Sequence, residues 1–155
     1  MKSLQESGLH HTGFIVQDVD EAVDIFKNTY GISAEEPYDF YPSKAWSYGR
    51  PVTDYCLRIA MIPMENGSQI EIIQPVSGEG VHKHFIENGK QGLHHICFAV
   101  DDYKYWRDYF FRRGYPIIFE SETEDKIHGY RRCFYANCEG INMIYEIKEN
   151  PYFRE

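Results

Sequence analysis

The feature that most constrains this chain is an internal repeat. Residues 8–26 read GLHHTGFIVQDVDEAVDIF, and residues 92–110 read GLHHICFAVDDYKYWRDYF. Nine of these 19 aligned positions are identical, at a constant offset of 84 residues. A match of this length predicts that the chain folds as two copies of one supersecondary module, because repeats at a fixed period are the signature of stacked or paired packing units.

Each copy predicts the same order of elements: a strand, a helix and three further strands. The runs HTGFIV and HICFAV favour strands. Asp18 and Glu21 form a capping pattern that predicts the start of the first helix. Gly31 and Gly114 predict where the two helices end, as glycine often does. The later strands are expected over about 33–40, 56–63 and 69–75 in the first copy, and over 116–121, 130–136 and 141–148 in the second.

This order predicts an α+β fold in which a single domain spans residues 1–155. Its two βαβββ repeats cover about 8–75 and 92–148. A connector at 76–91 joins them and is expected to hold a short helix over 81–88. The length of 155 residues is enough for one domain to bury a sizeable core without disulfides.

The charge and the cysteines limit the expected partners and compartment. Sixteen Lys and Arg against 24 Asp and Glu give a net charge of −8, and no basic stripe is visible. This argues against nucleic acid and anionic membrane surfaces. No apolar run approaches the ~20 residues of a membrane span, and the first residues lack the apolar core of a secretory signal. The four cysteines form no CxxC motif, so we expect reduced thiols and a cytoplasmic protein.

Two histidines and two glutamates occupy matched positions in the two copies. His11 and His95 lie on strand faces with small neighbours, since side chains alternate faces along a strand. Glu71 and Glu146 each interrupt an apolar strand, where a carboxylate is costly to bury unless it is paired or bound to a cation. Alone, each would more often be an ordinary core or surface residue. Together, two imidazoles and two carboxylates suit a divalent ion such as Zn, Ni, Co, Fe or Mn.

At these residues the chain resembles the vicinal oxygen chelate superfamily. That group includes glyoxalase I, methylmalonyl-CoA epimerase, extradiol dioxygenases and the fosfomycin- or bleomycin-resistance proteins. The resemblance covers about residues 8–148 and implies a curled eight-stranded mixed sheet around a metal-binding cleft. It also implies one bound divalent ion (Zn, Ni, Co, Mn or Fe) and a homodimer. The matching ligand positions are His11, Glu71, His95 and Glu146, with His10 and His94 as non-ligating neighbours.

The segment EGVHKHFIENGKQGLHHICFAVDD most resembles methylmalonyl-CoA epimerases. This implies a metal-dependent isomerase that moves a proton α to the carbonyl of an acyl-CoA thioester, with Glu146 as the base. Such epimerases use a second glutamate near the third strand. The stretch GRPVTDYCLRIAM has none, so either Asp54 is the second base or the protein carries out related chemistry on another substrate. Binding of the CoA phosphates requires cations, for which the candidates are Arg58, Lys83, Lys90, Arg131 and Arg132.

Three alternatives remain open on the sequence. A glyoxalase I-like lactoylglutathione lyase, acting on a thiol hemithioacetal, would use the same His, Glu, His and Glu. A non-catalytic member that binds a small ligand would have less need of both carboxylates. A purely structural metal site would be closed by four protein ligands, without an exchangeable water.

Overall fold

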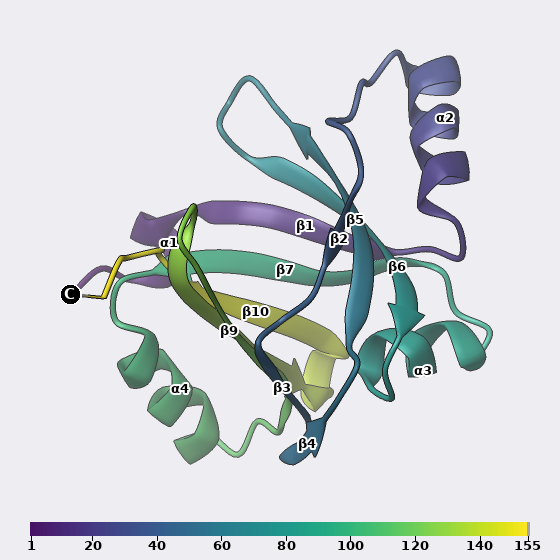
Figure 1. Ribbon diagram of the computed structural model, residues 1–155. Coiled ribbons are helices and arrows are strands. Elements are labelled where there is room, and N and C mark those ends of the chain that lie inside the picture. The colour runs from purple at the N-terminus through teal and green to yellow at the C-terminus, as the bar shows by residue number, and fades with distance from the viewer. Residues whose placement is uncertain (155) are drawn as a thin grey trace.

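Ten strands form one mixed sheet that curls into a half-barrel, in the order β2-β5-β6-β1-β7-β10-β9-β8-β3-β4 (Figure 1). This computed structural model describes residues 1–154. The strands are β1 (Leu9–Ile15), β2 (Tyr38–Phe40), β3 (Lys44–Ser47), β4 (Arg50–Val52), β5 (Cys56–Pro63), β6 (Gln69–Ser77), β7 (Gly92–Val100), β8 (Ile117–Asp125), β9 (Gly129–Cys138) and β10 (Met143–Glu149). The helices are α1 (Leu4–Ser7), α2 (Val19–Tyr30), α3 (Val81–Glu87) and α4 (Tyr103–Arg112), with a 3₁₀ turn at Glu139–Ile141.

The sheet has the same strand order on both sides of its middle. β1 and β7 pair antiparallel at the centre. β6 then lies parallel to β1, and β10 lies parallel to β7. β5 and β2 continue on one side, and β9 and β8 on the other. The prediction of an α+β fold with a curled mixed sheet is therefore confirmed. We refer to residues 8–75 as the N-terminal half and to residues 92–148 as the C-terminal half.

The prediction of eight strands is wrong, because residues 33–52 form three short strands where one was expected. β2 is only three residues long and is followed by Tyr41 and Pro42, and a proline cannot donate to a strand ladder. β3 and β4 then form a hairpin whose turn residues, Tyr48 and Gly49, both have positive φ, of 50° and 77°. Such turns match the twist of the flanking strands. β3 leaves its own half and pairs with β8.

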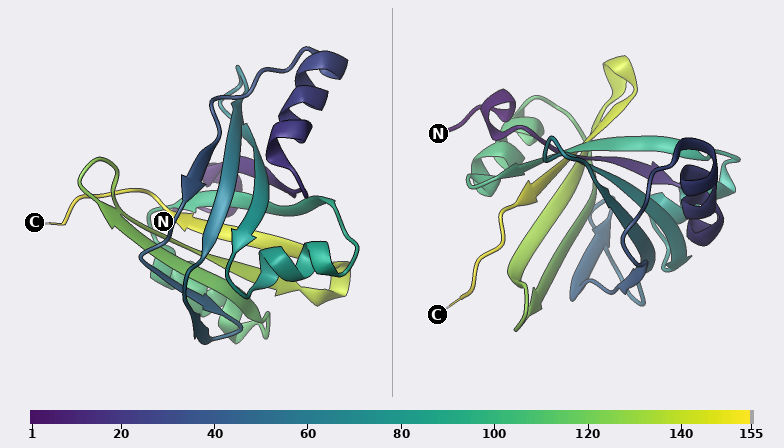
Figure 2. Two further views of the ribbon diagram at one scale, coloured as in Figure 1. Left: turned by 45° about the vertical axis from the view of Figure 1, so that its right-hand side comes forward. Right: turned by 90° about the horizontal axis from the view of Figure 1, so that it is seen from above.

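Two helices cover the outer surface of the sheet, one over each half (Figure 2). α2 packs an aliphatic cluster of Val19, Ala60, Ile62 and Ile72, and α4 packs a mostly aromatic one around Tyr103, Phe110 and Phe134. Asp18 caps α2 by accepting a hydrogen bond from the backbone N–H of Glu21, and Gly31 ends it at a φ of 68°. The expected helix boundaries at Asp18 and Gly31 are confirmed.

The connector between the two halves contacts both of them through a buried side chain of α3. α3, which the sequence predicts over 81–88, carries His82 into a buried position between a tyrosine of each half. Its Nδ1 lies 2.7 Å from the Tyr55 hydroxyl, and its Nε2 lies 2.9 Å from the Tyr135 hydroxyl. No helix among residues 1–154 is long and apolar enough to cross a membrane.

Candidate metal centre

Four side chains from four strands of the sheet meet at one point. His11 on β1, Glu71 on β6, His95 on β7 and Glu146 on β10 each offer one ligand atom, and these atoms all lie within 4.8 Å of one another. The Nε2 of His11 lies 3.4 Å from an oxygen of Glu71 and 2.8 Å from Oε2 of Glu146. The Nε2 of His95 lies 3.6 Å and 3.2 Å from the same two oxygens. The structure thus brings together the four residues that the sequence selects.

The strand register explains why these four residues meet. Gly13 stands opposite Glu71 in the β1–β6 pair and opposite His95 in the β1–β7 pair. A Cβ atom on Gly13 would lie 2.2 Å from the imidazole of His95, so any side chain here would displace that ring. In the second half, Cys97 stands opposite Glu146. The glycine therefore has a direct role, since it leaves the space into which His95 turns.

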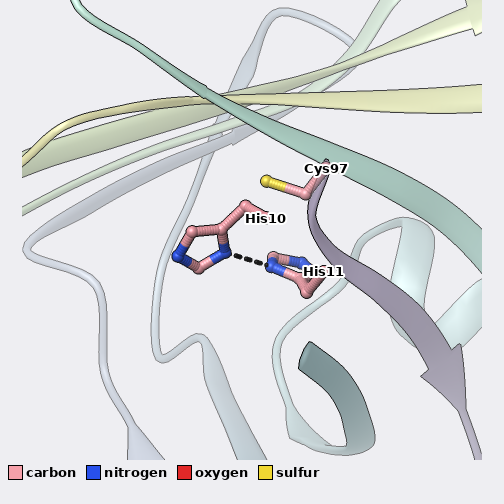
Figure 3. Close-up of side chains that lie close together, drawn as sticks. All are labelled: His10, His11 and Cys97. Carbon is pink, nitrogen blue, oxygen red and sulfur yellow. Dashed lines mark hydrogen bonds between the residues drawn. The ribbon is translucent and has the colours of Figure 1, made fainter. Parts of the chain in front are cut away.

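Each candidate histidine ligand is held by the histidine that precedes it. The Nδ1 atoms of His10 and His11 lie 2.8 Å apart (Figure 3), and those of His94 and His95 lie 2.9 Å apart. An imidazole that binds a metal through Nε2 carries its proton on Nδ1, so the neighbour must accept there. The sequence missed this role of His10 and His94. The repeated HH dipeptide was the available signal, but dipeptides alone do not show which nitrogens meet.

The charges at the site favour neutral outer histidines and ionised carboxylates. Burial, and next the positive charge of Lys148, lower the pKa of His10 to about 4. Burial also lowers the pKa of His94 well below its ordinary value. Burial opposes ionisation of Glu71 and Glu146, but His11 outweighs it and lowers the pKa of both carboxyls. His10 and His94 are therefore neutral near pH 7, as hydrogen-bond acceptors at Nδ1 must be.

The arrangement fits a divalent cation better than it fits pairwise hydrogen bonds. Oε2 of Glu146 is buried and makes no hydrogen bond of good geometry with any described residue, although two imidazole nitrogens lie near it. Such an atom is costly to bury without a partner. Two imidazoles and two carboxylates are the donors that Zn, Ni, Co, Fe and Mn accept. A cation held by all four side chains would remove this cost.

A second group of possible ligands, His10, His11 and Cys97, lies beside the first and shares His11 with it (Figure 3). Burial and the nearby Glu146 raise the pKa of Cys97 to about 12. The thiolate is the metal-binding form of cysteine, so this protonated thiol is a poor ligand at neutral pH. The set with two glutamates is therefore the better candidate.

The four residues border a cavity of about 630 Å³ whose two sides differ in chemistry. The strands of the N-terminal half supply an apolar wall made of Phe40, Leu57, Ile59, Met61 and Ile73. The strands of the C-terminal half supply a mostly polar wall made of Ser121, Thr123, Arg131, Arg132, Cys133 and Lys148, with Phe119 as an apolar member. Tyr135 lies between this wall and the site, with its ring 4.8 Å from that of His95.

Asp54 is not brought to this cavity. It is exposed in the turn before β5, at a φ of 54°, and it is not among the residues that line the cavity. Glu71 and Glu146 are the carboxylates that line it among the described residues. No carboxylate therefore lies where the second base was expected, next to the third strand. The cavity face of β5 carries Leu57, Ile59 and Met61 instead.

The candidate cations for CoA separate into two groups. Arg58 is engaged with Asp20 at 3.1 Å, Lys83 pairs with Glu79 and Glu87, and Lys90 is exposed. Arg132 is held by Glu149 and lies over the ring of Tyr103 at 4.2 Å. Arg131 and Arg132 both line the cavity, and Arg131 is the better placed because fewer of its donors are in use.

The family model described as the glyoxalase/bleomycin resistance protein/dioxygenase superfamily matches residues 10–134. The chain belongs to this superfamily. The match includes His11, Glu71 and His95 and ends before Glu146, so the resemblance is confirmed at the level of the family.

Two curated relatives carry related names. The chain is 26% identical over 122 residues to an ethylmalonyl-CoA/methylmalonyl-CoA epimerase of Cereibacter sphaeroides, covering 78% of this chain and 81% of that one. It is 25% identical over 95 residues to a mitochondrial methylmalonyl-CoA epimerase of Dictyostelium discoideum, covering 61% of this chain. The chain spans 49% of the length of this second relative.

Solved structures share the fold. A methylmalonyl-CoA epimerase from Mycobacterium tuberculosis superposes with a TM-score of 0.67 at 18% identity, covering 94% of this chain and 88% of that one. A Streptomyces coelicolor methylmalonyl-CoA epimerase variant in complex with 2-nitronate-propionyl-CoA gives 0.62 at 17% identity, covering 93% and 97%. At these identities the likeness shows the fold alone.

Proposed function

We propose that this chain is a divalent-metal-dependent epimerase that moves a proton α to the carbonyl of an acyl-CoA thioester, as in methylmalonyl-CoA epimerase. The convergence of His11, Glu71, His95 and Glu146 at the edge of a cavity carries this proposal. The names of the curated relatives favour it over a glyoxalase I-like lyase, which would use the same four residues.

The four residues would hold the ion, and each half would supply one imidazole and one carboxylate. When bound, a divalent ion supplies a Lewis acid that stabilises negative charge on a carbonyl oxygen. His10 and His94 keep Nε2 of His11 and His95 directed at the centre, because each accepts a hydrogen bond at Nδ1. His11, His95 and Glu146 are at most 7% exposed, so most of their surface is covered by protein.

Proton transfer falls to the carboxylates. Glu146 is ionised at neutral pH, because His11 outweighs burial and lowers the pKa of its carboxyl, and it would accept a proton through an oxygen freed from the centre. Epimerisation requires that the proton return to the other face of the α-carbon. Glu71 approaches from the opposite half of the sheet and is the other carboxylate at the cavity among residues 1–154. We assign Glu146 and Glu71 to the two faces.

The test is solvent-deuterium incorporation at the α-carbon of methylmalonyl-CoA, followed by NMR with Co²⁺-loaded protein. We expect exchange that stops in His95→Ala and after chelation. The slow uncatalysed exchange is measured without protein. His84→Ala is the matched control that should keep exchanging, because the His84 side chain on α3 is 45% exposed and does not line the cavity. Exchange no faster than this background in metal-loaded protein would overturn the proposal. Formation of a thioester from a hemithioacetal, measured by absorbance, would favour the lyase instead.

A further inference from the structure

The polar wall contains two cations whose matched positions in the other half are apolar. Lys148 stands opposite Cys133 in the β9–β10 pair, as Ile73 stands opposite Ile59 in the β5–β6 pair. Arg131 lies two residues before Cys133, as Leu57 lies two residues before Ile59. Since the repeat places these residues at equivalent points of the cavity, the fold itself does not require the cations.

Lys148 is placed on the cavity side of β10 without a partner. It lies two residues after Glu146 on the same face of the strand, and both residues line the cavity. Its ammonium group makes no hydrogen bond or ion pair with any residue in the range 1–154. The side chain is half-buried, and its ammonium is not among the fully buried atoms that lack a partner, so it stays in contact with water in the cavity. An anionic ligand would supply the missing partner.

Arg131 is fixed in position but keeps donors free. Its Nη1 donates to Oδ2 of Asp125 at 3.0 Å and to the carbonyl oxygen of Gly129 at 3.1 Å. Its Nε and Nη2 donate to none of the described residues. Arg132, the next residue, differs because both its Nε and Nη2 are used by Glu149. Arg131 is therefore a guanidinium held at one end, with its remaining N–H groups free for a planar anion.

We propose that Lys148 and Arg131 form a binding site for an anionic oxygen group, a carboxylate or a phosphate, beside the candidate metal centre. The proposal deepens the proposed function, on which it rests for the nature of the substrate. The closeness of Lys148 to Glu146 favours a carboxylate on the acyl group, near the reacting carbon. The apolar residues opposite, among them Leu57, Ile59 and Ile73, would face the uncharged part of the same ligand.

The probe is methylmalonate, titrated calorimetrically into Co²⁺-loaded protein, with its uncharged dimethyl ester and free CoA as separate arms. We expect Lys148→Met and Arg131→Met each to weaken methylmalonate binding roughly 10- to 100-fold, as loss of a hydrogen bond to a charged group does. Binding of the dimethyl ester should not change. Lys148→Arg should retain most of the affinity. Lys126→Met, at an exposed lysine that does not line the cavity, is the matched control.

Each outcome bears on the proposal. A loss confined to free CoA would also support an anion site, and would identify a phosphate as its ligand. Equal binding of both anions by the wild type and by both methionine variants would overturn the site. Circular dichroism and unfolding midpoints check that the variants fold. Methylmalonate binding that depends on Lys148, without α-proton exchange, would retain the anion site and reject the epimerase.

Discussion

The N-terminal and C-terminal halves build the candidate metal centre in the same way but line the cavity differently. Each half supplies a histidine from its central strand and a glutamate from the neighbouring parallel strand. Beyond these, the N-terminal half has Ile59 and Ile73 where the C-terminal half has Cys133 and Lys148. The positions where four donors must meet are thus the same, whereas the walls differ. Two unlike walls around a symmetric centre can distinguish the two ends of an asymmetric substrate.

The outer faces of the halves differ as well. The cluster under α2 is aliphatic, whereas the cluster under α4 contains Tyr103, Phe110 and Phe134 with Trp106 at its edge. The cluster under α2 includes Ile72 of β6, and the cluster under α4 includes Ile147 of β10, so each packs against the strand that carries its half's glutamate. The two halves are therefore equivalent as scaffolds for the four ligands but differ in the chemistry of the cavity walls that they supply.

The largest effect is expected where the carboxylates of the two halves are exchanged for amides. Glu146→Gln should slow exchange of the epimer whose α-proton faces Glu146 roughly 10²- to 10⁴-fold, the usual range for a positioned acid or base, and should leave exchange of the other epimer through Glu71. Glu71→Gln should stop interconversion of the epimers but leave exchange of one epimer, because the proton can then leave and return on one face only. NMR of each separate epimer in deuterated water measures both quantities.

Metal content distinguishes these roles from simple loss of the ion. Each variant should be analysed by mass spectrometry after loading, and exchange rates compared per bound ion. If the two variants lose exchange of both epimers equally while keeping the ion, the assignment of one carboxylate to each face is incorrect.

The scaffold comparison predicts similar losses from the two outer cores. Phe134→Ala should lower the free energy of unfolding by about 3–5 kcal/mol, and Ile72→Ala by about 2–5 kcal/mol, because both side chains are fully buried and leave cavities. Urea unfolding measures both values. Phe111→Ala, at a side chain that is 72% exposed, is the control and should change stability by no more than about 0.5 kcal/mol. A negligible loss in only one core would show that the halves are not equivalent scaffolds.

The histidine pairs predict an equal and smaller effect in the two halves. His10→Leu and His94→Leu should each weaken metal binding about 10- to 100-fold, the range seen when the partner of a ligand is removed. Competition with a chromogenic chelator measures the affinity, and His84→Leu at an exposed position is the control. Unchanged affinity in either variant would remove the positioning role from that half.

Much of the fold could be predicted because its signals are local and repeated. The caps of α2, the helix α3 and the paired βαβββ order all follow from short patterns. The hairpin of β3 and β4 could not be predicted, because the signal for its turn, Tyr48-Gly49, is not one of the usual Asn-Gly or Asp-Gly pairs. Its pairing with β8 joins segments more than 70 residues apart, which no local pattern specifies.

In the candidate site, too, the residues that repeat in both halves could be predicted and the others could not. His11, Glu71, His95 and Glu146 could be selected because each half repeats the same residue types at the same strand positions. Asp54 was selected because it is close in sequence to the place of an expected glutamate. In the folded sheet Asp54 lies in a turn, and Ile59 lines the cavity instead. Lys148 has no counterpart in the other half, so the repeat gave no reason to select it. Its relevance depends on which wall it lines, a property of the folded sheet.

The smallest predicted effect concerns His82, which joins the two halves through Tyr55 and Tyr135. Burial lowers the pKa of this imidazole to about 3, whereas an unfolded histidine titrates near about 6.5. Below about pH 6.5 the unfolded chain binds a proton at His82 that the folded chain does not bind. Folding stability therefore falls as the pH drops from about 6.5 towards about 3. In this range the loss of stability caused by His82 is about 1 kcal/mol per pH unit, and above about pH 6.5 this loss is absent.

Urea unfolding at pH 7, 6 and 5, with chelator present, should therefore show a shallower loss of stability in His82→Gln than in the wild type. The carboxylates Glu71 and Glu146 also lose stabilising charge on acidification, but they are common to both proteins and cancel in the difference between slopes. Identical slopes would mean that His82 is protonated within the fold. The contact between the halves would then tolerate a charged imidazole. Both ring nitrogens of His82 would donate hydrogen bonds, one to the Tyr55 hydroxyl and one to the Tyr135 hydroxyl.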